Sequence, residues 1–399
     1  MRIAVVGTGG VGAAVAAVAK RRDFFDAITF ADLDPSRPAA LVDRERDARF
    51  AAAQVDASSR GSVAALLRAS RSDVLLNATD PRFDPQLFAA ALDAGCTYVD
   101  MAMTLSSPGV LLGERQFEAH EEWERRGLLA LVGMGVEPGL SDVFARYAAD
   151  HLFSGIDEVA VRDGANLVVD GYDFAPTFSI WTTIEECLNP PLVWERGRGF
   201  YTTEPFSEPE LFEFPEGIGV TECVNVEHEE VVLVPRAIDC RRVTFKYGLG
   251  AEFIEVLKTL HKLGLDSTEP VRVRGVEVAP RDMVAAALPD PATLGDRMRG
   301  KTCAGTLVTG TGVGGAPRAV YLYHVADNER TMREYGHQAV VLQTALNPVV
   351  ALELIAGGTW RGAGVLGPES FDAVPFLELL AEYGEPHATV EGDPRQSTP

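Results

Sequence analysis

The sequence predicts an α/β fold, an open and doubly wound parallel sheet followed by a second part with an α+β pattern. Two observations predict the sheet. Over residues 1–134, short apolar runs rich in β-branched residues alternate with helix-forming segments, which is typical of parallel strands joined by helices. The first of these units carries the glycine pattern G-x-G-x-x-G between its strand and its helix, the context of a dinucleotide-binding turn.

The first strand, residues 3–6, runs directly into the glycine turn and then into a helix-forming stretch at 13–20. Each glycine has a mechanical reason in a dinucleotide-binding turn. Gly7 makes the tight turn, Gly9 lets the backbone approach a pyrophosphate, and Gly12 lets the helix pack on the strand. The anion is expected on the helix N-terminus, where free N–H groups favour it. The predicted cofactor residues here are Gly7, Thr8, Gly9, Gly10, Val11 and Gly12.

The second strand, residues 27–31, ends at Asp32. A carboxylate at the end of this strand can accept hydrogen bonds from both ribose hydroxyls of NAD and repels the extra phosphate of NADP. The alternative is a surface aspartate before the Asp34-Pro35 turn. We predict NAD as the cofactor, with NADP disfavoured but not fully excluded.

Further strands are predicted at 52–56, 73–79, 97–100 and 128–132, with helices at 59–69, 85–94 and 114–126. In open α/β sheets, ligands bind outside the carboxyl ends of the strands. The predicted cofactor residues at these ends are Asp56, Ser58, Asn77, Ala78, Thr79, Met101 and Gly135. Two alternatives stay open: a helix N-cap at Ser58 or Ser59, and a turn residue at Asn77.

After a helix opening at Pro138, the texture of the sequence changes. Residues 164–235 are rich in glycine, proline and aromatic residues, and the alternating run 229–234 favours a strand. The remaining predictions are strands at 156–162 and 241–247, a helix at 251–263, a loop and helix at 266–300 and a hairpin at 302–325. This pattern predicts an α+β domain on a mixed or antiparallel sheet.

The C-terminal section returns to helices. Residues 338–356 form an apolar helix that Pro348 should kink or break, and 375–383 form a short amphipathic helix. The residues from 386 to 399 are predicted to be a disordered tail.

Composition excludes some classes of function. A formal net charge of -22 argues against non-specific binding to nucleic acid or to anionic membranes. The apolar runs are short for a membrane span, and a strand beginning at residue 2 leaves no room for a signal peptide. The scattered cysteines favour free thiols in a reducing cytoplasm, and the histidine spacing predicts no metal site.

Several stretches together resemble the saccharopine dehydrogenase family. They are the N-terminal G-T-G-G-V-G, Y-V-D at 98–100, G-M-G-V-E-P-G-L-S-D at 133–142, W-T-T at 181–183, N-P-P at 189–191, F-K-Y at 245–247 and G-V-L-G-P-E-S-F at 364–371. The resemblance implies a Rossmann domain interrupted by a substrate domain, with C-terminal helices returning to it. The implied division is 1–134 with 338–385 for the Rossmann domain, and 135–337 for an α+β substrate and dimerisation domain.

The resemblance also implies an enzyme that transfers a hydride between nicotinamide and a carbon bearing nitrogen. The amine must be unprotonated to react, so a base is needed near the nicotinamide. Within the family, lysine 6-dehydrogenase is the nearest expectation, and the substrate is an amine or amino acid. The alternatives are reductive condensation of the saccharopine or carboxynorspermidine type, and a non-catalytic NAD-binding protein. A cytoplasmic homodimer is expected.

Candidate residues for the chemistry lie at strand ends and in the second part. Asp100, Glu137 and Tyr172 are the predicted catalytic residues; the alternatives are a loop cap, a solvated carboxylate and a packed loop. Asp173, Arg241 and Lys246 are the predicted substrate-binding residues. A substrate carboxylate needs a cation, which favours Lys246, although it can also belong to a charged strand face.

Overall fold

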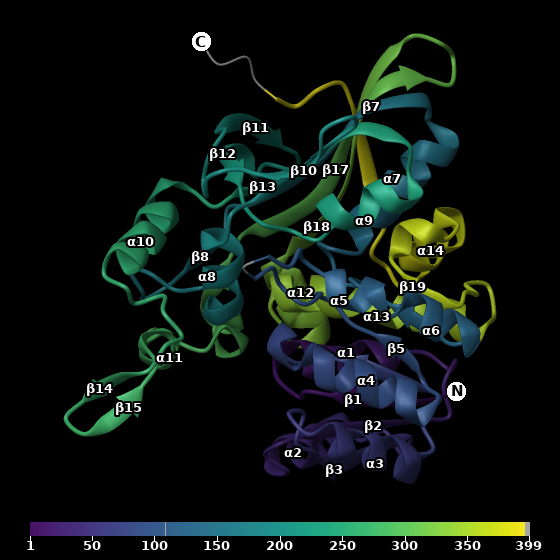
Figure 1. Ribbon diagram of the computed structural model, residues 1–399, viewed down its shortest axis with the longest axis vertical. Helices are drawn as coiled ribbons and strands as arrows, with labels where there is room; N and C mark the ends of the chain where they lie inside the picture. Colours follow the sequence, from purple (N-terminus) through teal and green to yellow (C-terminus); the bar gives the residue numbers. More distant parts are fainter. Residues whose placement is uncertain (108, 396–399) are drawn as a thin grey trace.

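The computed structural model describes residues 1–107 and 109–395, and its N-terminal part is built on a parallel sheet (Figure 1). All neighbouring strands of this sheet run parallel, as predicted. In spatial order the strands are β19 (Gly364–Leu366), β6 (Leu129–Leu131), β5 (Thr97–Val99), β4 (Val74–Asn77), β1 (Arg2–Val6), β2 (Ala27–Asp32) and β3 (Phe50–Gln54).

The helices of this part are α1 (Gly10–Ala19), α2 (Ser36–Glu45), α3 (Arg60–Ser70), α4 (Asp84–Ala94), α5 (Glu114–Glu118) and α6 (His120–Arg125). The predicted helix at 114–126 is therefore two short helices that meet at Ala119. Most of α1 is alanine and valine and is buried, because it lies between the sheet and a C-terminal helix. The predicted doubly wound α/β architecture is confirmed.

The C-terminal part of the chain returns to this sheet. β19 pairs in parallel with β6, and α13 (Ala339–Ala356) packs along α1. Although α13 is long and apolar enough to cross a membrane, 78% of it is buried inside the protein, as in the core helix of a folded domain. Pro348 does not break α13, because close packing on several sides holds the helix where one backbone hydrogen bond is missing. The proposed domain limits at 134 and 338 stay a prediction.

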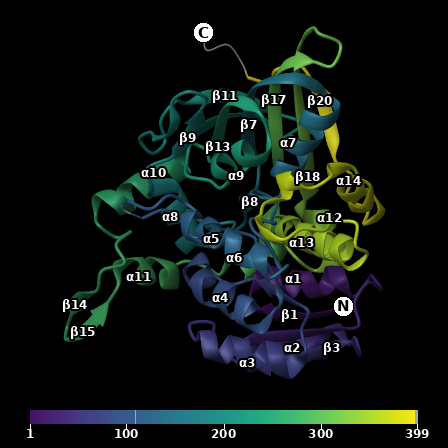
Figure 2. The same cartoon turned by 45° about the vertical axis from the view of Figure 1, so that its right-hand side comes forward.

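The second part is built on a mixed sheet (Figures 1 and 2). Its main strands, in spatial order, are β10 (Gly199–Thr202), β9 (Leu192–Glu195), β13 (Cys240–Gly248), β7 (Phe153–Ala165), β17 (Lys301–Gly312), β18 (Pro317–Asp327) and β20 (Ala388–Glu391). A side branch, β11 (Glu210–Phe214) and β12 (Gly219–Asn225), joins the sheet at β13. Within the sheet, β7 and β13 pair in parallel, and the other pairs are antiparallel.

Helices cover this sheet and join it to the parallel sheet. They are α7 (Leu140–His151), α8 (Ile180–Leu188), α9 (Glu230–Ala237), α10 (Ala251–Lys262), α11 (Pro280–Ala287), α12 (Asn328–Tyr335) and α14 (Ala373–Glu382). The predicted strand at 229–234 is wrong: these residues enter α9, and its four successive apolar residues 231–234 are all buried. A fully buried helix shows no clear periodicity, so a short apolar run does not distinguish it from a strand.

Two further segments differ from the prediction. Residues 266–300 contain a small hairpin, β14 (Val271–Val273) and β15 (Val276–Val278), which extends away from the body of the protein with α11 (Figure 1). The tail is ordered through Arg395, because β20 pairs with β18 and Arg395 contacts Glu158 at 2.7 Å. Predicted disorder at 396–399 lies outside the described residues.

Candidate active site

The glycine turn has the geometry that a dinucleotide requires. Gly7 has a φ of +99°, and a Cβ there would lie 2.4 Å from the Ala78 carbonyl oxygen. A Cβ on Gly12 would lie 2.0 Å from the Gly7 carbonyl oxygen, so only glycine fits at either position. Open space surrounds Gly9, and α1 begins there with neither a side-chain cap nor an acidic residue in its first turn. The free N–H groups of this helix end therefore fit a pyrophosphate.

Asp32 lies at the end of β2, beside the glycine turn. One of its oxygens, Oδ2, accepts hydrogen bonds from both the backbone N–H and the hydroxyl of Thr8, each at 2.9 Å. Its other oxygen accepts a longer bond of 3.2 Å from the backbone of Asp34. Asp32 thus holds the glycine turn in place with one oxygen, and the other has acceptor capacity left for a ribose.

The other predicted cofactor residues divide into two groups. Ala78, Thr79 and Met101 line a cleft beside the glycine turn, as do Asn77, Gly10 and Val11. The Asn77 side chain is occupied within the protein, because it donates to Asp84 and Tyr98 and accepts from Thr79. It therefore shapes the loop after β4 and is withdrawn as a direct ribose ligand.

Asp56 and Ser58 do not line the cleft. Asp56 accepts hydrogen bonds from the backbone and hydroxyl of Ser58, and Ser59 caps α3, which matches the N-cap alternative. Gly135 acts through its backbone: a Cβ there would lie 2.9 Å from the Met101 carbonyl oxygen. The nicotinamide end of the site is thus formed by two tightly packed loops, after β5 and after β6.

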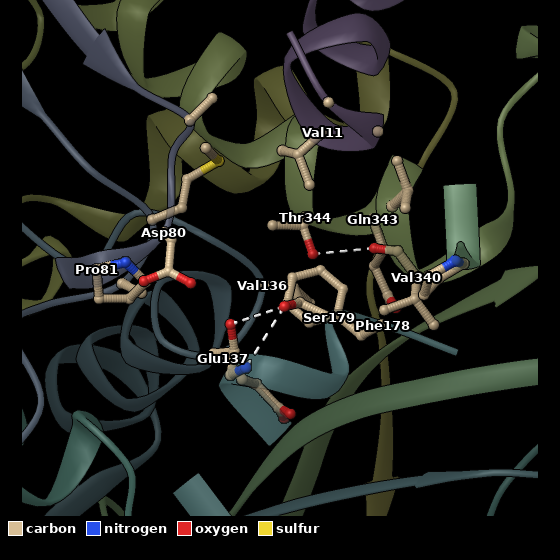
Figure 3. Close-up of a pocket in the computed structure, with 18 of the residues that line it drawn as sticks. Val11, Asp80, Pro81, Val136, Glu137, Phe178, Ser179, Val340, Gln343 and Thr344 are labelled. Atoms are coloured by element: carbon tan, nitrogen blue, oxygen red, sulfur yellow. Dashed lines mark hydrogen bonds between the residues drawn. The ribbon is translucent and has the colours of Figure 1, made fainter. Parts of the chain in front are cut away.

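Residues from both the first and the second part of the chain line the cleft, and Figure 3 draws 18 of them. Val11 comes from α1, Asp80 and Pro81 from the loop after β4, and Glu137 from the loop after β6, while Ser179 precedes α8. Val340, Gln343 and Thr344 of α13 close another side. The titratable residues that line it are Asp80, Asp100, Glu137, Asp163, Glu186, His228, Tyr247 and Asp290. No lysine or arginine of the described chain is among its lining residues.

Asp100 is fully buried at the end of β5. Its Oδ1 accepts the backbone N–H of Gly133 at 2.6 Å, and its Oδ2 accepts the side-chain N–H of Gln116 at 2.9 Å. Burial raises the pKa of Asp100 to about 8, although these hydrogen bonds act in the opposite direction. Because both oxygens are bound by the protein, Asp100 has the contacts of a residue that fixes the loop after β6.

Glu137 is placed differently. Its Oε1 accepts the backbone N–H of Gly305 at 3.1 Å, and its Oε2 is buried without a hydrogen-bond partner among the described residues. Burial and the nearby charge of Asp163 raise the pKa of Glu137 well above its usual range. Burial also raises the pKa of Asp163 to about 6, against a hydrogen bond from Glu137 that lowers it. The two acidic groups repel each other when both are ionised, which favours a proton on one of them.

The sequence analysis missed His228, Asp163 and Glu186. His228 is 2% exposed and stacks on Phe245, with 3.7 Å between the ring centroids and 11° between the planes. Its Nδ1 lies 2.6 Å from Oε2 of Glu230 and 3.4 Å from Oε2 of Glu229. A run of charged residues, E-H-E-E, inside an apolar stretch was the signal available in the sequence.

Charge explains the state of this histidine. Burial alone would lower the pKa of His228, but Glu230, Glu229 and Glu186 raise it to about 10. Burial has the opposite effect on an acid, and it raises the pKa of Glu186 to about 8. Ligand atoms of His228, Glu229 and Glu230 lie within 4.8 Å of one another, a spacing that a metal ion also needs. In this geometry the neighbouring acidic side chains favour the protonated form of the imidazole.

Four predicted residues lie outside the cleft. Tyr172 and Asp173 are exposed, and Arg241 lies on a separate surface beside Asp157. Lys246 is buried, and its ammonium donates to Oε2 of Glu210 at 2.9 Å and to the carbonyl of Glu208 at 2.7 Å. Tyr172, Asp173, Arg241 and Lys246 therefore do not line this cleft, and its geometry gives their predicted roles no support.

Fold and site together define a nicotinamide-dinucleotide-dependent oxidoreductase with an acidic substrate cleft. The chain belongs to the saccharopine dehydrogenase family: residues 3–131 match the model described as the saccharopine dehydrogenase NADP binding domain, and residues 135–385 match its C-terminal domain. The predicted family is confirmed, and with it the NAD(P)-dependent oxidation or reduction of amine-related substrates.

Two relatives that match nearly the whole chain indicate which reactions occur within this family. The chain is 30% identical to a carboxynorspermidine synthase of Vibrio alginolyticus, over 99% of this chain and 98% of that protein. It is 29% identical to a carboxyaminopropylagmatine dehydrogenase of Synechocystis, over 98% of each chain. These names correspond to the condensation alternative of the sequence analysis and not to its first expectation, lysine 6-dehydrogenase.

Solved structures agree on the fold. Saccharopine dehydrogenase (L-Glu forming) of Saccharomyces cerevisiae matches 98% of this chain and 99% of its own, with a TM-score of 0.72 and 15% identity. Homospermidine synthase of Legionella pneumophila, solved in complex with NAD, matches 98% of this chain and 91% of its own, with a TM-score of 0.69 and 14% identity. At these identities the likeness concerns the fold alone.

Proposed function

We propose that this protein joins a diamine to an amino-acid aldehyde and reduces the resulting C=N bond with a nicotinamide cofactor. The observation that carries the proposal is the charge of the cleft. Acidic side chains from both parts of the chain line it, among them Asp80, Asp163 and Asp290, and His228 is the one basic side chain in the described lining. A diamine carries two ammonium groups, which acidic side chains from both parts of the chain can pair.

The products named in the relatives' names indicate which amine and which aldehyde are joined. Carboxynorspermidine contains an aminopropyl arm that bears a carboxyl group. Breaking the C–N bond next to that arm gives diaminopropane and the aldehyde of aspartate, aspartate semialdehyde. The same disconnection of carboxyaminopropylagmatine gives agmatine and the same aldehyde. The proposed substrates here are aspartate semialdehyde and an amine of this class.

The Glu137–Asp163 pair is the proposed base. An ammonium must lose a proton before its nitrogen can attack the aldehyde. The pair carries a carboxylate that can receive that proton, because burial and the repulsion between the two groups favour ionisation of only one of them. After reduction, the pair returns a proton to the new secondary amine. When bound, the nicotinamide supplies the hydride for the C=N carbon.

The finer features of the cofactor and its setting are also proposals. The free acceptor capacity of Asp32 and the neighbouring carboxylate of Asp34 support a preference for NAD over NADP. A cytoplasmic homodimer remains our proposal for the location and assembly of the protein.

The test follows oxidation of NADH and NADPH at 340 nm, a wavelength at which the reduced nicotinamide absorbs. Diaminopropane, putrescine, agmatine or lysine is added with and without aspartate semialdehyde. The proposal predicts oxidation only when amine and aldehyde are both present, and a coupled secondary amine in the mass spectrum. A separate mixture contains lysine and NAD without an aldehyde. Formation of NADH in that mixture, together with the absence of a coupled product in all the others, would instead establish the lysine 6-dehydrogenase alternative.

A further inference from the structure

The acidic cleft presents one cationic side chain whose position has no role in the reaction as described so far. His228 follows β12 and precedes α9, and its ring is fixed on three sides. Phe245 covers one face of the ring, Tyr247 meets it edge-on with 6.0 Å between centroids, and Glu230 holds Nδ1. The ring therefore has one orientation, and it lines the cleft.

The two carboxylates beside the ring are themselves held from behind. Ser141 donates its hydroxyl to Oε1 of Glu230 at 2.7 Å, and the backbone N–H of Met103 donates to Oε1 of Glu229 at 2.9 Å. Each therefore turns its Oε2 toward Nδ1 of His228. Nδ1 is committed to this pair, while Nε2 has no hydrogen-bond partner among the described residues and is the nitrogen left for a ligand in the cleft.

The ring also lies at the reacting end of the cleft. Glu229 is tied to Met103, which follows the β5 loop at Met101, where the nicotinamide is expected. The carboxylates of Asp163 on β7 and Glu186 on α8 face the same ring and act on it electrostatically. His228 therefore lines the same cleft as the proposed base and acts electrostatically on Asp163, one member of the pair.

We propose that His228 is the acid of the condensation step, delivering the proton of Nε2 to the hydroxyl of the carbinolamine so that water leaves. This inference rests on the proposed function. The Nε2–H bond breaks and an O–H bond forms, the C–O bond breaks, and the lone pair of the amine nitrogen forms the C=N bond of the iminium. His228 is left neutral and takes one proton from solvent, which is the proton that reduction of an aldehyde and an ammonium consumes overall.

The charge of the surroundings suits this role. A proton donor in a cleft full of carboxylates must stay protonated at neutral pH, and the pKa of about 10 that Glu230, Glu229 and Glu186 give His228, against the effect of burial, meets that need. An unpaired histidine buried to this extent would be neutral and have no second proton to give.

The first experiment compares His228→Gln with the wild type, using diaminopropane, aspartate semialdehyde and NADH. His228→Gln keeps an N–H donor near Nε2 but has no acidic proton. We expect kcat to fall by on the order of 10²-fold or more, with KM changed much less. The control is His261→Gln, which removes an exposed histidine that also pairs with a carboxylate, Asp266, and should leave kcat unchanged.

The second experiment replaces Glu230 by Gln, which can still accept from Ser141 but turns an N–H toward Nδ1. That N–H favours the neutral ring, so the alkaline limb of the kcat profile should move to lower pH. Nuclear magnetic resonance of ¹⁵N-labelled histidine gives the same shift without turnover: the imidazolium signal of His228 should persist to about pH 10 in the wild type and be lost earlier in the variant.

The outcomes separate the two proposals. If the wild type does not couple amine and aldehyde, the proposed function fails whatever His228 does. If it couples them and His228→Gln keeps its kcat, or raises only KM, the acid role is overturned. An unchanged pH profile in Glu230→Gln overturns it also when His228→Gln does not fold. Inhibition by a chelator and recovery with a divalent ion would contradict it, because a metal on the ring would displace its proton.

Discussion

Thr8 donates both its backbone N–H and its hydroxyl to a single oxygen of Asp32, at 2.9 Å in each case. The residue expected to read the ribose therefore also fixes the turn that receives the pyrophosphate. This double contact means that a change at Asp32 has two effects, one on cofactor choice and one on the affinity for either cofactor.

The first prediction concerns cofactor choice. The wild type should have the higher kcat/KM with NADH, because the phosphate of NADPH would lie beside the Asp32 carboxylate. Asp32→Ser should reduce this preference, because it weakens the binding of NADH and removes the repulsion between the carboxylate and the phosphate of NADPH. Thr8→Val is the control: it loosens the turn but keeps the charge, so it should weaken both cofactors and leave their ratio unchanged. Equal or better use of NADPH by the wild type would refute the role of Asp32.

The second prediction concerns the proposed base. Glu137→Gln removes one of the two carboxyl groups of the proposed base, so kcat at neutral pH should fall by about 10²-fold or more. Activity should partly recover at high pH, where free amine is abundant. Glu213→Gln, at an exposed position on β11, is the matched control and should be unaffected. A pH-rate profile settles the matter, and normal turnover of Glu137→Gln would remove it from the mechanism.

The third prediction concerns stability and pH. Burial raises the pKa of Asp100 from its ordinary 3.8 to about 8, so the folded state holds a proton that the unfolded chain releases. The contribution of Asp100 to stability is therefore fully present below about pH 4 and is lost as the pH rises toward 8. Asp100→Asn cannot ionise, so its unfolding free energy relative to the wild type should rise between pH 5 and pH 8.

Urea unfolding of both proteins across that range checks this prediction. The constant cost of changing the hydrogen bonds to Gly133 and Gln116 shifts the whole curve and leaves the slope intact. A difference that is flat with pH would show that Asp100 is ionised in the folded protein.

The fourth prediction concerns the tail. Truncation after His387 removes β20 and the contact of Arg395 with Glu158, and should lower the free energy of unfolding by about 1–3 kcal/mol. Arg395→Ala keeps the strand and removes only a partly exposed ion pair, so it should cost less than about 1 kcal/mol. Equal stability of the truncated and full chains would contradict the pairing of β20 with β18.

Fold elements were predicted best from the sequence where the pattern that identifies them lies within one short stretch. The turn from Gly7 to Gly12 shows its glycine spacing within six residues, and the strand that ends at Asp32 shows an apolar run within a similar length. Lys246 shows why other residues could not be predicted. Its position on β13 was correct, but Glu210, which neutralises it, is separated from it by a whole strand and loop, and no local pattern reports that pairing.

The same limit explains His228. Its neighbours Glu229 and Glu230 were visible in the sequence, but the run was predicted to be a strand, which would have turned alternate side chains to opposite faces. In the structure the chain enters a buried helix there, and this brings both carboxylates onto one side of the imidazole. The acidic cleft is a product of tertiary structure, because its carboxylates come from loops and strands of both sheets.

The central claim is that a hydride reduces a C=N bond formed between an amine and an aldehyde. It is tested most directly with NADH that carries deuterium at the transferred position, mixed with diaminopropane and aspartate semialdehyde. The account predicts a coupled secondary amine with one deuterium on the aldehyde-derived carbon that now bears the amine nitrogen. If the deuterium appears instead in the alcohol that forms by direct reduction of the aldehyde, and no coupled product is found, the account is contradicted.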